Sequence, residues 1–329
     1  MKPTPRQAEV PDDPQRPRFF PSGFLRKIPV ERPASGWRVH VALLFVQLFF
    51  GAFPVVGKLG LLEIRPSTFA LFRSLGAAAV LQLFCQLRRE PSLGNWGDYG
   101  RVLVYGLLGV TLNQLLSING LKLTTAMHTT VLVGTIPIFA LIAATVKGQE
   151  KPSLKNWFGI SLGFLGVLFL VFQWSDRTQS ASLLGDLMIL SNCLIYGIYL
   201  VVTRDILKRQ SAWTVVAWVF TFGSLAMLPV ALLEPISFSY SSRAWGIILF
   251  AIAFPSVGAY LLNNYALQRA PTSTVAVYIY LQPVITAVLA IWILDERAGW
   301  DLAVGAACIF SGVAIASRRT GNPQPVQNP

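Results

Sequence analysis

The sequence predicts an all-helical integral membrane protein, with ten transmembrane helices built from two inverted five-helix repeats. Three observations lead to this fold class. The chain of 329 residues is 53% hydrophobic and 13% charged, about half the charged share of a typical soluble domain. Its apolar residues fall into ten runs long enough to cross the roughly 30 Å hydrocarbon core of a bilayer as helices. The chain also matches itself at an offset of 146 residues.

The ten apolar runs are the predicted transmembrane helices. They span residues 40–61, 66–87, 101–121, 125–147, 155–173, 183–204, 212–232, 244–266, 272–294 and 300–317. A soluble protein cannot bury ten helices that are apolar around their whole circumference. The runs are also too long for the strands of a membrane barrel, which need about ten alternating residues.

Polar segments flank the runs at both ends of the sequence. Residues 1–39 contain eight prolines and charges of both signs, a composition typical of a disordered, water-exposed tail. No apolar stretch precedes Val41, and four acidic residues precede it, so we expect neither a secretory signal nor an organelle transit peptide there. Residues 318–329 form a second polar tail.

Basic residues divide unevenly between the two sides of the predicted membrane region. If the N-terminus is cytoplasmic, the inner segments hold 20 Lys and Arg residues and the outer segments hold five; without the N-terminal tail the counts are 12 and five. Because Lys and Arg favour cytoplasmic loops, we expect a multi-pass protein of the inner or plasma membrane with both termini in the cytoplasm. The net charge of +12 then records orientation and does not indicate nucleic-acid binding.

The internal match is carried by residue types that rarely coincide by chance in apolar sequences. The matched pairs are Gly51 and Gly197, Pro137 and Pro283, Glu150 and Glu296, Gly159 and Gly305, and Gly166 and Gly312. Residues 40–173 and 183–317 are the two predicted repeats. Because each repeat holds five helices, the second enters the membrane in the opposite orientation. Secondary transporters with this plan bind substrate near mid-membrane, between the repeats.

The same residues carry a family resemblance. Gly120 to Ala126, Pro137 and Glu150 in the first repeat, with the segments ending at Pro283 and Glu296 in the second, resemble the ten-helix branch of the drug/metabolite transporter superfamily, which has two EamA-type repeats. The resemblance covers residues 40–317. It implies a secondary carrier, proton-linked or otherwise and most often an exporter, with a central cavity for a small metabolite such as an amino acid or an amphipathic drug.

Uncharged polar and aromatic residues within the runs are the candidate substrate contacts. They are Asn113, Gln114, Ser117, Asn192, Tyr196, Tyr199, Tyr260, Asn263, Asn264, Tyr278 and Gln282. A cavity lined by amides and aromatic rings suits a zwitterion or an amphipathic metabolite. The alternative role is hydrogen bonding between helices, which membrane bundles use routinely.

Two cations, Lys58 and Arg73, lie within the predicted spans. Charges at this depth are costly and usually face the bundle or a watery cavity. Lys58 lies near the outer end of its helix, so it either extends to the membrane surface or joins Arg73 at the cavity. Two cations at one mouth would favour a carboxylate or phosphate. A phosphorylated or nucleotide-linked metabolite is therefore the alternative substrate.

Other polar or helix-breaking residues have two interpretations each. Pro137 and Pro283 fall in the middle of predicted helices, where each frees a carbonyl one turn earlier and either kinks a packed helix or lines the cavity. Glu150 and Glu296 follow the ends of the same helices, as caps for the next helix or as gate residues.

A proton-coupling site has two weak candidates. His128 opens the fourth run and Asp186 lies near the outer start of the sixth. Histidine is the side chain whose charge most readily changes near physiological pH, although a histidine at a helix end is more often an interface residue. We expect a small-molecule substrate, a lipid bilayer and protons as a candidate coupling ion, in a monomer or homodimer.

The sequence lacks the motifs that several other classes of protein require. The three cysteines lie in hydrophobic runs and are typical of small core residues rather than disulfides or metal ligands. We find no nucleotide-binding loop, metalloprotease motif or catalytic cluster at one membrane face, so we expect no enzyme, no cofactor and no metal. A membrane enzyme and a receptor or scaffold using the Pro-rich tail remain the alternatives from other classes.

Overall fold

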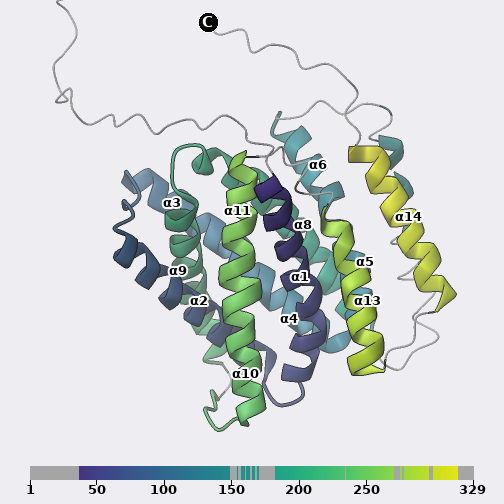
Figure 1. Ribbon diagram of the computed structural model, residues 1–329, viewed down its shortest axis with the longest axis horizontal. Helices are drawn as coiled ribbons and strands as arrows, with labels where there is room; N and C mark the ends of the chain where they lie inside the picture. The colour runs from purple at the N-terminus through teal and green to yellow at the C-terminus, as the bar shows by residue number, and fades with distance from the viewer. Residues whose placement is uncertain are drawn as a thin grey trace, which may run out of the picture. The chain divides into compact units, whose positions relative to one another are not determined.

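The computed structural model describes residues 37–148, 182–233, 235–269, 278–295 and 299–317, together with Val275 and isolated residues between 154 and 169. Within these residues every regular element is helical (Figure 1). Both predicted tails, apart from residues 37–39, lie outside this part of the chain, as do Glu150, Glu296 and most of the predicted helix 155–173.

The helices follow the predicted apolar runs closely. The first half contains α1 (Trp37–Gly60), α2 (Pro66–Arg88), α3 (Trp96–Gly106), η1 (Leu107–Leu112), α4 (Asn113–Leu123), α5 (Ala126–Val133) and α6 (Ile136–Val146). The second half contains α8 (Leu183–Leu207), α9 (Ala212–Ala231), α10 (Ser242–Ala251), η2 (Ile252–Gly258), α11 (Ala259–Arg269), η3 (Tyr278–Tyr280), α13 (Leu281–Leu294) and α14 (Trp300–Ser317).

Seven helical spans in the described residues are long and apolar enough to cross a membrane. They are Trp37–Gly60, Pro66–Arg88, Trp96–Leu123, Ala126–Val146, Leu183–Leu207, Ala212–Ala231 and Ser242–Arg269. The helix α13 and the segment Ala303–Gly312 of α14 are apolar but shorter. The chain is therefore a multi-pass membrane protein, and the count of ten helices stays a prediction.

The side chains are arranged for an apolar surrounding. Large hydrophobic residues such as Leu44, Phe45 and Trp292 are exposed on the helices, whereas Gln47 and Thr286 are buried between them. This distribution is the one expected where lipid, rather than water, covers the outer face of the bundle.

Two spans contain a π-helical segment in the middle, η1 in the third predicted run and η2 in the eighth. An offset of 146 residues carries η1 onto residues 253–258, within η2. In η2, the Ser256 hydroxyl donates to the Ala251 carbonyl, five residues earlier, at 2.8 Å. Single π-helical turns of this kind are frequent at functional sites.

The two prolines differ from their predicted setting. The run 125–147 forms one helical span that is interrupted at Gly134 and Thr135, between α5 and α6. Pro137 lies in the first turn of α6, where no helical partner is needed for the missing N–H. Pro283 is the third residue of α13, directly after η3. Each proline thus begins a new helical segment rather than bending a continuous one.

Glycines permit close helix contacts at two pairs of related positions. A methyl group on Gly51 of α1 would lie 3.0 Å from Cβ of Ile285 on α13, and one on Gly197 of α8 would lie 2.9 Å from Cβ of Phe139 on α6. Figure 1 shows α1 running beside α13. At the 146-residue offset, Gly51 corresponds to Gly197 and Phe139 corresponds to Ile285, so the two contacts are equivalent.

The second related pair exchanges small and large residues. A methyl group on Gly106 of α3 would lie 3.3 Å from Cβ of Phe222 on α9. At the equivalent contact, a methyl group on Gly76 of α2 would lie 2.9 Å from Cγ1 of Ile252 in η2. In the two related contacts the glycine thus belongs to opposite partners, while the helices approach each other closely in both.

Candidate functional site

A cavity of about 100 Å³ lies among the helices and is lined from both halves of the chain. Its walls come from α1, α2, α4, α5 and α6 in the first half and from α8, α11, η3 and α13 in the second, with Val275. The aromatic part of the wall includes Phe50, Phe53, Tyr196 and Tyr260. Concave sites with a mostly apolar lining and a few polar groups are the usual form of small-molecule sites.

Eight of the eleven predicted contact residues line this cavity. They are Asn113, Gln114, Ser117, Asn192, Tyr196, Tyr260, Asn263 and Gln282. The other three lie behind the wall or at its end. Tyr199 stacks on Tyr196 with ring centroids 5.6 Å apart, Asn264 donates to the Tyr260 carbonyl at 2.8 Å, and the Tyr278 hydroxyl lies 2.6 Å from Nδ1 of His40.

Some lining groups already have protein partners. The Gln282 amide donates to the side-chain oxygen of Gln47 at 2.6 Å, and the Tyr260 hydroxyl donates to the Gly109 carbonyl at 2.8 Å. Asn192 donates to the backbone carbonyl of Asn113 at 2.7 Å. These bonds fix the shape of the cavity by joining helices from opposite halves.

Gln114 differs from these groups. Its side chain is 1% exposed and lines the cavity, yet neither its amide oxygen nor its amide nitrogen has a hydrogen-bond partner within the described residues. A buried amide without a partner costs about 1–3 kcal/mol, and such groups are rare in native proteins. Water or a ligand in the cavity would satisfy it.

Arg73 of α2 contributes the charge of the cavity wall. Its side chain is 5% exposed and lines the cavity. Nε donates to the hydroxyl of Ser256 at 2.7 Å, and the guanidinium carbon lies 4.2 Å from the ring centre of Phe53. The π-helical segment η2 thus supplies the hydroxyl that orients this guanidinium.

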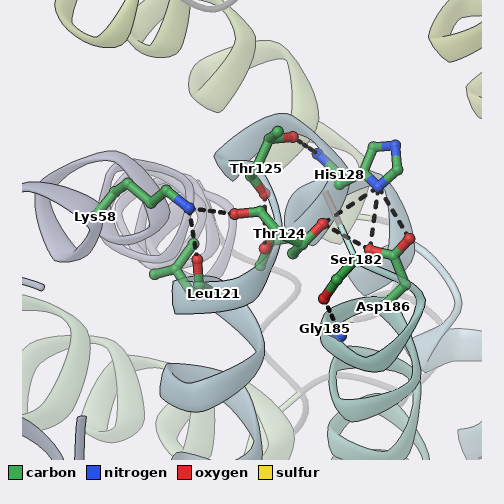
Figure 2. Close-up of polar contacts among 9 residues, drawn as sticks. Lys58, Leu121, Thr124, Thr125, His128, Ser182, Gly185 and Asp186 are labelled. Atoms are coloured by element: carbon green, nitrogen blue, oxygen red, sulfur yellow. Dashed lines mark hydrogen bonds and ion pairs between the residues drawn. The ribbon is translucent and has the colours of Figure 1, made fainter. Parts of the chain in front are cut away.

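Lys58, the second predicted intramembrane cation, is partly buried and is not among the residues that line the cavity. Its ammonium donates to the Leu121 carbonyl at 2.9 Å and also to the carbonyl of Thr124 (Figure 2). These carbonyls belong to the C-terminal end of α4, where the helix dipole favours a positive charge. Lys58 therefore caps the end of α4, and its predicted extension to the membrane surface stays a prediction.

Lys58 belongs to a group of polar residues that we call the end cluster, which consists of Lys58, Thr124, His128 and Asp186. Nδ1 of His128 lies 3.1 Å from Oδ1 of Asp186, and the Thr124 hydroxyl donates to the same oxygen at 2.7 Å. Figure 2 shows these side chains converging from α1, α5 and α8 and from the link between α4 and α5. The two predicted proton-coupling candidates, far apart in sequence, are therefore in direct contact.

Comparison with known proteins places this arrangement in a family. The model of the EamA-like transporter family matches the chain twice, at residues 37–172 and at residues 183–318. The chain belongs to the EamA-like transporter family. The two matched segments begin and end with the same offset of 146 residues.

Relatives of this EamA-like transporter include proteins that are named as transporters. An uncharacterized transporter of Archaeoglobus fulgidus is 28% identical over 86% of this chain and 98% of its own length. The uncharacterized transporter YetK of Bacillus subtilis is 27% identical over 93% of this chain and 94% of its own. A WAT1-related protein of Arabidopsis thaliana is 23% identical over 84% of this chain and 85% of its own.

The fold has also been observed before. A solved crystal structure aligns with 86% of this EamA-like transporter and 97% of its own chain, with a TM-score of 0.62 and 18% sequence identity. Together, the family and the named relatives indicate a membrane transporter of small molecules rather than an enzyme. Within the part of the chain described, no three His, Cys, Asp or Glu side chains gather closely enough to hold a metal ion.

The cavity lining of this EamA-like transporter includes residues that the sequence did not predict, and the polar ones are Gln47, Thr129 and Thr130. Gln47 of α1 is buried, lines the cavity and accepts the hydrogen bond from Gln282. An amide in the middle of the first apolar run was the available signal, because polar residues inside a transmembrane segment usually face the bundle.

Proposed function

We propose that this protein is a secondary active transporter that exports a small metabolite by alternating access around the central cavity. One observation carries the proposal: the cavity is polar and aromatic, lies inside the bundle, and takes its lining from both segments that match the family. Substrate sites of this kind lie between the two repeats of a carrier.

The size of the cavity favours a substrate on the scale of an amino acid or a small amphipathic drug. A water molecule needs on the order of 10–15 Å³ of such volume. The cavity of about 100 Å³ therefore has room for a ligand of roughly ten non-hydrogen atoms by the same measure.

Residues 40–173 and 183–317 form the two inverted five-helix repeats of this proposal, with ten helices in all. The two family matches with a common offset support it. So do the paired contacts of Gly51 with Ile285 and of Gly197 with Phe139, because a pseudo-two-fold relation between the repeats exchanges them.

Two contacts are the proposed gates. The end cluster joins α5 to α8 through His128 and Asp186, and the His40–Tyr278 contact joins α1 to η3. His40 and Asp186 are equivalent at the 146-residue offset, whereas Tyr278 corresponds to Leu132, about one helical turn after His128. The two contacts therefore lie at similar, though not identical, places in the two repeats. Alternating access would open one contact while the other stays closed.

The proposed orientation has both termini in the cytoplasm of a cell whose inner or plasma membrane holds the protein. It rests on the excess of basic residues in the inner segments. The end cluster then faces outward. Protons are the proposed coupling ion, with His128 and Asp186 as the groups that bind them, and Glu150 and Glu296 keep their proposed roles as caps or gate residues.

The test is transport by the purified full chain reconstituted into lipid vesicles. We expect flux of at least one amino acid, nucleoside or amphipathic drug, driven faster when a pH gradient is imposed. Flux that ignores the gradient would remove the proton-coupled part of the proposal. The absence of flux for every compound would contradict the carrier function itself. Removing residues 1–36 is the control, because a carrier retains transport without the tail whereas a tail-dependent scaffold does not.

A further inference from the structure

The guanidinium of Arg73 is buried with most of its hydrogen-bonding capacity unused. Arginine has five N–H donors, and within the described residues the one hydrogen bond from Arg73 is that from Nε to Ser256. Among the ion pairs formed by the described residues, none involves Arg73. Burying an unpaired charge is costly, so the structure leaves an anion to be supplied.

The described residues that line the cavity do not supply this anion. Neither Asp nor Glu occurs among the described residues that line it, so Arg73 gives the lining a charge of +1. Lys58, the other intramembrane cation, is held by the carbonyls at the end of α4. A ligand that enters the cavity therefore meets one cation without a counter-charge.

Gln114 is a second and independent indication of a ligand. Its amide is buried, lines the same cavity and is without a hydrogen-bond partner in the described part of the chain. It projects from α4, which packs against the helix α2 that carries Arg73. An amide donor and a guanidinium in the wall of one cavity are suited to the oxygens of an anionic head group.

The charge and shape of the site favour a carboxylate. One guanidinium balances a monoanion and binds a planar carboxylate through two parallel hydrogen bonds, whereas a phosphate dianion would leave one negative charge in the bundle. The guanidinium carbon lies 4.2 Å from the centre of the Phe53 ring, and Nε is the one guanidinium donor with a hydrogen-bond partner among the described residues. Phe50, Tyr196 and Tyr260 provide further ring surfaces for an apolar or aromatic body.

We propose that the cavity binds a small organic monoanion, with its carboxylate on Arg73 and Gln114 and its uncharged, largely aromatic body among the rings. This inference rests on the proposed carrier function, since it names the substrate class of the same cavity.

The experiment compares four ligands that share one ring and differ in head group. Benzoate, phenyl phosphate, benzylamine and benzyl alcohol are titrated calorimetrically into the purified full chain in detergent. We expect benzoate to bind at least about tenfold more tightly than the other three. In R73Q the affinity for benzoate should fall about 10- to 100-fold, as expected for hydrogen bonds to a charged group, while benzyl alcohol is unaffected.

Three further variants separate the binding role from a structural one. Q114L should weaken benzoate binding about three- to tenfold, and R73K should give an intermediate loss, because Lys keeps the charge without the planar pair of donors. K122Q is the control, since it removes an exposed cation that does not line the cavity and should preserve the preference for benzoate. If R73Q does not fold, as judged by gel filtration and its unfolding transition, R73K and Q114L decide the question.

Four results would overturn the inference. They are equal affinity for benzoate and benzyl alcohol, unchanged benzoate affinity in the folded Arg73 variants, tighter binding of phenyl phosphate than of benzoate, and no binding by any of the four ligands. Vesicle flux separates this failure from failure of the carrier function. Flux of a cation or zwitterion without benzoate binding would contradict only the proposal that the substrate is an anion. Arg73-dependent benzoate binding without any flux would contradict only the carrier function.

Discussion

Arg73 and Lys58 both bring a cation into the membrane-spanning region, but their surroundings differ in one respect that decides their roles. The ammonium of Lys58 donates to backbone carbonyls at the end of α4. The guanidinium of Arg73 lines the cavity and makes one hydrogen bond with the part of the chain that the structure describes. The same contrast holds for their neighbours. Thr124, His128 and Asp186 bond to one another, while Gln114 lacks a partner in the described residues.

Burial and charge alone therefore do not identify a binding residue. A buried polar group with protein partners stabilises the fold, and one that faces a cavity without partners is available to a ligand. Substitutions in the end cluster should therefore lower the free energy of unfolding, whereas substitutions at the cavity should act on binding.

The largest effect on stability is expected from D186A. It removes the acceptor shared by His128 and Thr124 in a buried site, which should cost about 2–4 kcal/mol. Denaturant unfolding in detergent micelles measures it. The matched control is D205A on the same helix, because Asp205 pairs with Lys147 and Lys208 at an exposed position and should cost less than about 1 kcal/mol. If D186A and D205A lowered the free energy of unfolding equally, the end cluster would not have the structural role that distinguishes it from the cavity.

A smaller loss is expected from K58M, which keeps the length of the side chain but leaves the carbonyls of Leu121 and Thr124 without their donor. The expected cost is about 1–3 kcal/mol, measured by the same unfolding transition. K122M is the control on the adjoining helix end, where the side chain is exposed and the change should stay within about 0.5 kcal/mol. A K58M variant of unchanged stability would show that the cap is not structural.

The next effect in size belongs to T124V, which replaces one hydroxyl by a methyl group of similar volume. Loss of the 2.7 Å bond to Asp186 should cost about 1 kcal/mol. The comparison is T203V, a buried threonine whose hydroxyl donates to Tyr199 one turn earlier in its own helix. A larger loss for T203V than for T124V would argue against a stabilising end cluster.

The smallest effect on stability, and one of opposite sign, is expected from Q114L. Replacing an unpartnered buried amide by an apolar side chain of similar size should be neutral or should stabilise the unliganded protein by up to about 1 kcal/mol. Unfolding without ligand tests this. A loss of 2 kcal/mol or more would mean that the Gln114 amide has a structural partner, and the contrast between cavity and end cluster would fail.

Much of the fold followed from hydropathy, because apolar length is the property that a bilayer selects. The predicted runs 40–61 and 66–87 became α1 and α2 with small changes at their ends. The π-helical segments were not predicted, since a one-residue change in hydrogen-bond register leaves no mark on composition. The breaks at Gly134 and before Leu281 were predicted only as kinks, because a proline in a sequence does not show which helical segment it belongs to.

The site was predictable in kind but not in detail. Polar residues such as Asn113 and Asn263 line the cavity as their place in the runs suggested. Lys58 and Arg73 looked alike in sequence, because their difference depends on which atoms of α4 and η2 lie nearby. The contact of His128 with Asp186 joins residues 58 positions apart, and a single sequence carries no signal for such a distance.

The π-helical segments also determine how the helices that follow them are rotated about their own axes. One residue turns an α-helix by about 100°, so η2 determines which side of α11 is presented to the bundle, as η1 does for α4. A deletion of one residue within Ile252–Gly258 would restore an ordinary α-helix while turning Tyr260 and Asn263 away from the cavity wall. The side of α4 and of α11 that faces the cavity thus depends on the hydrogen-bond register of the backbone as well as on the choice of side chains.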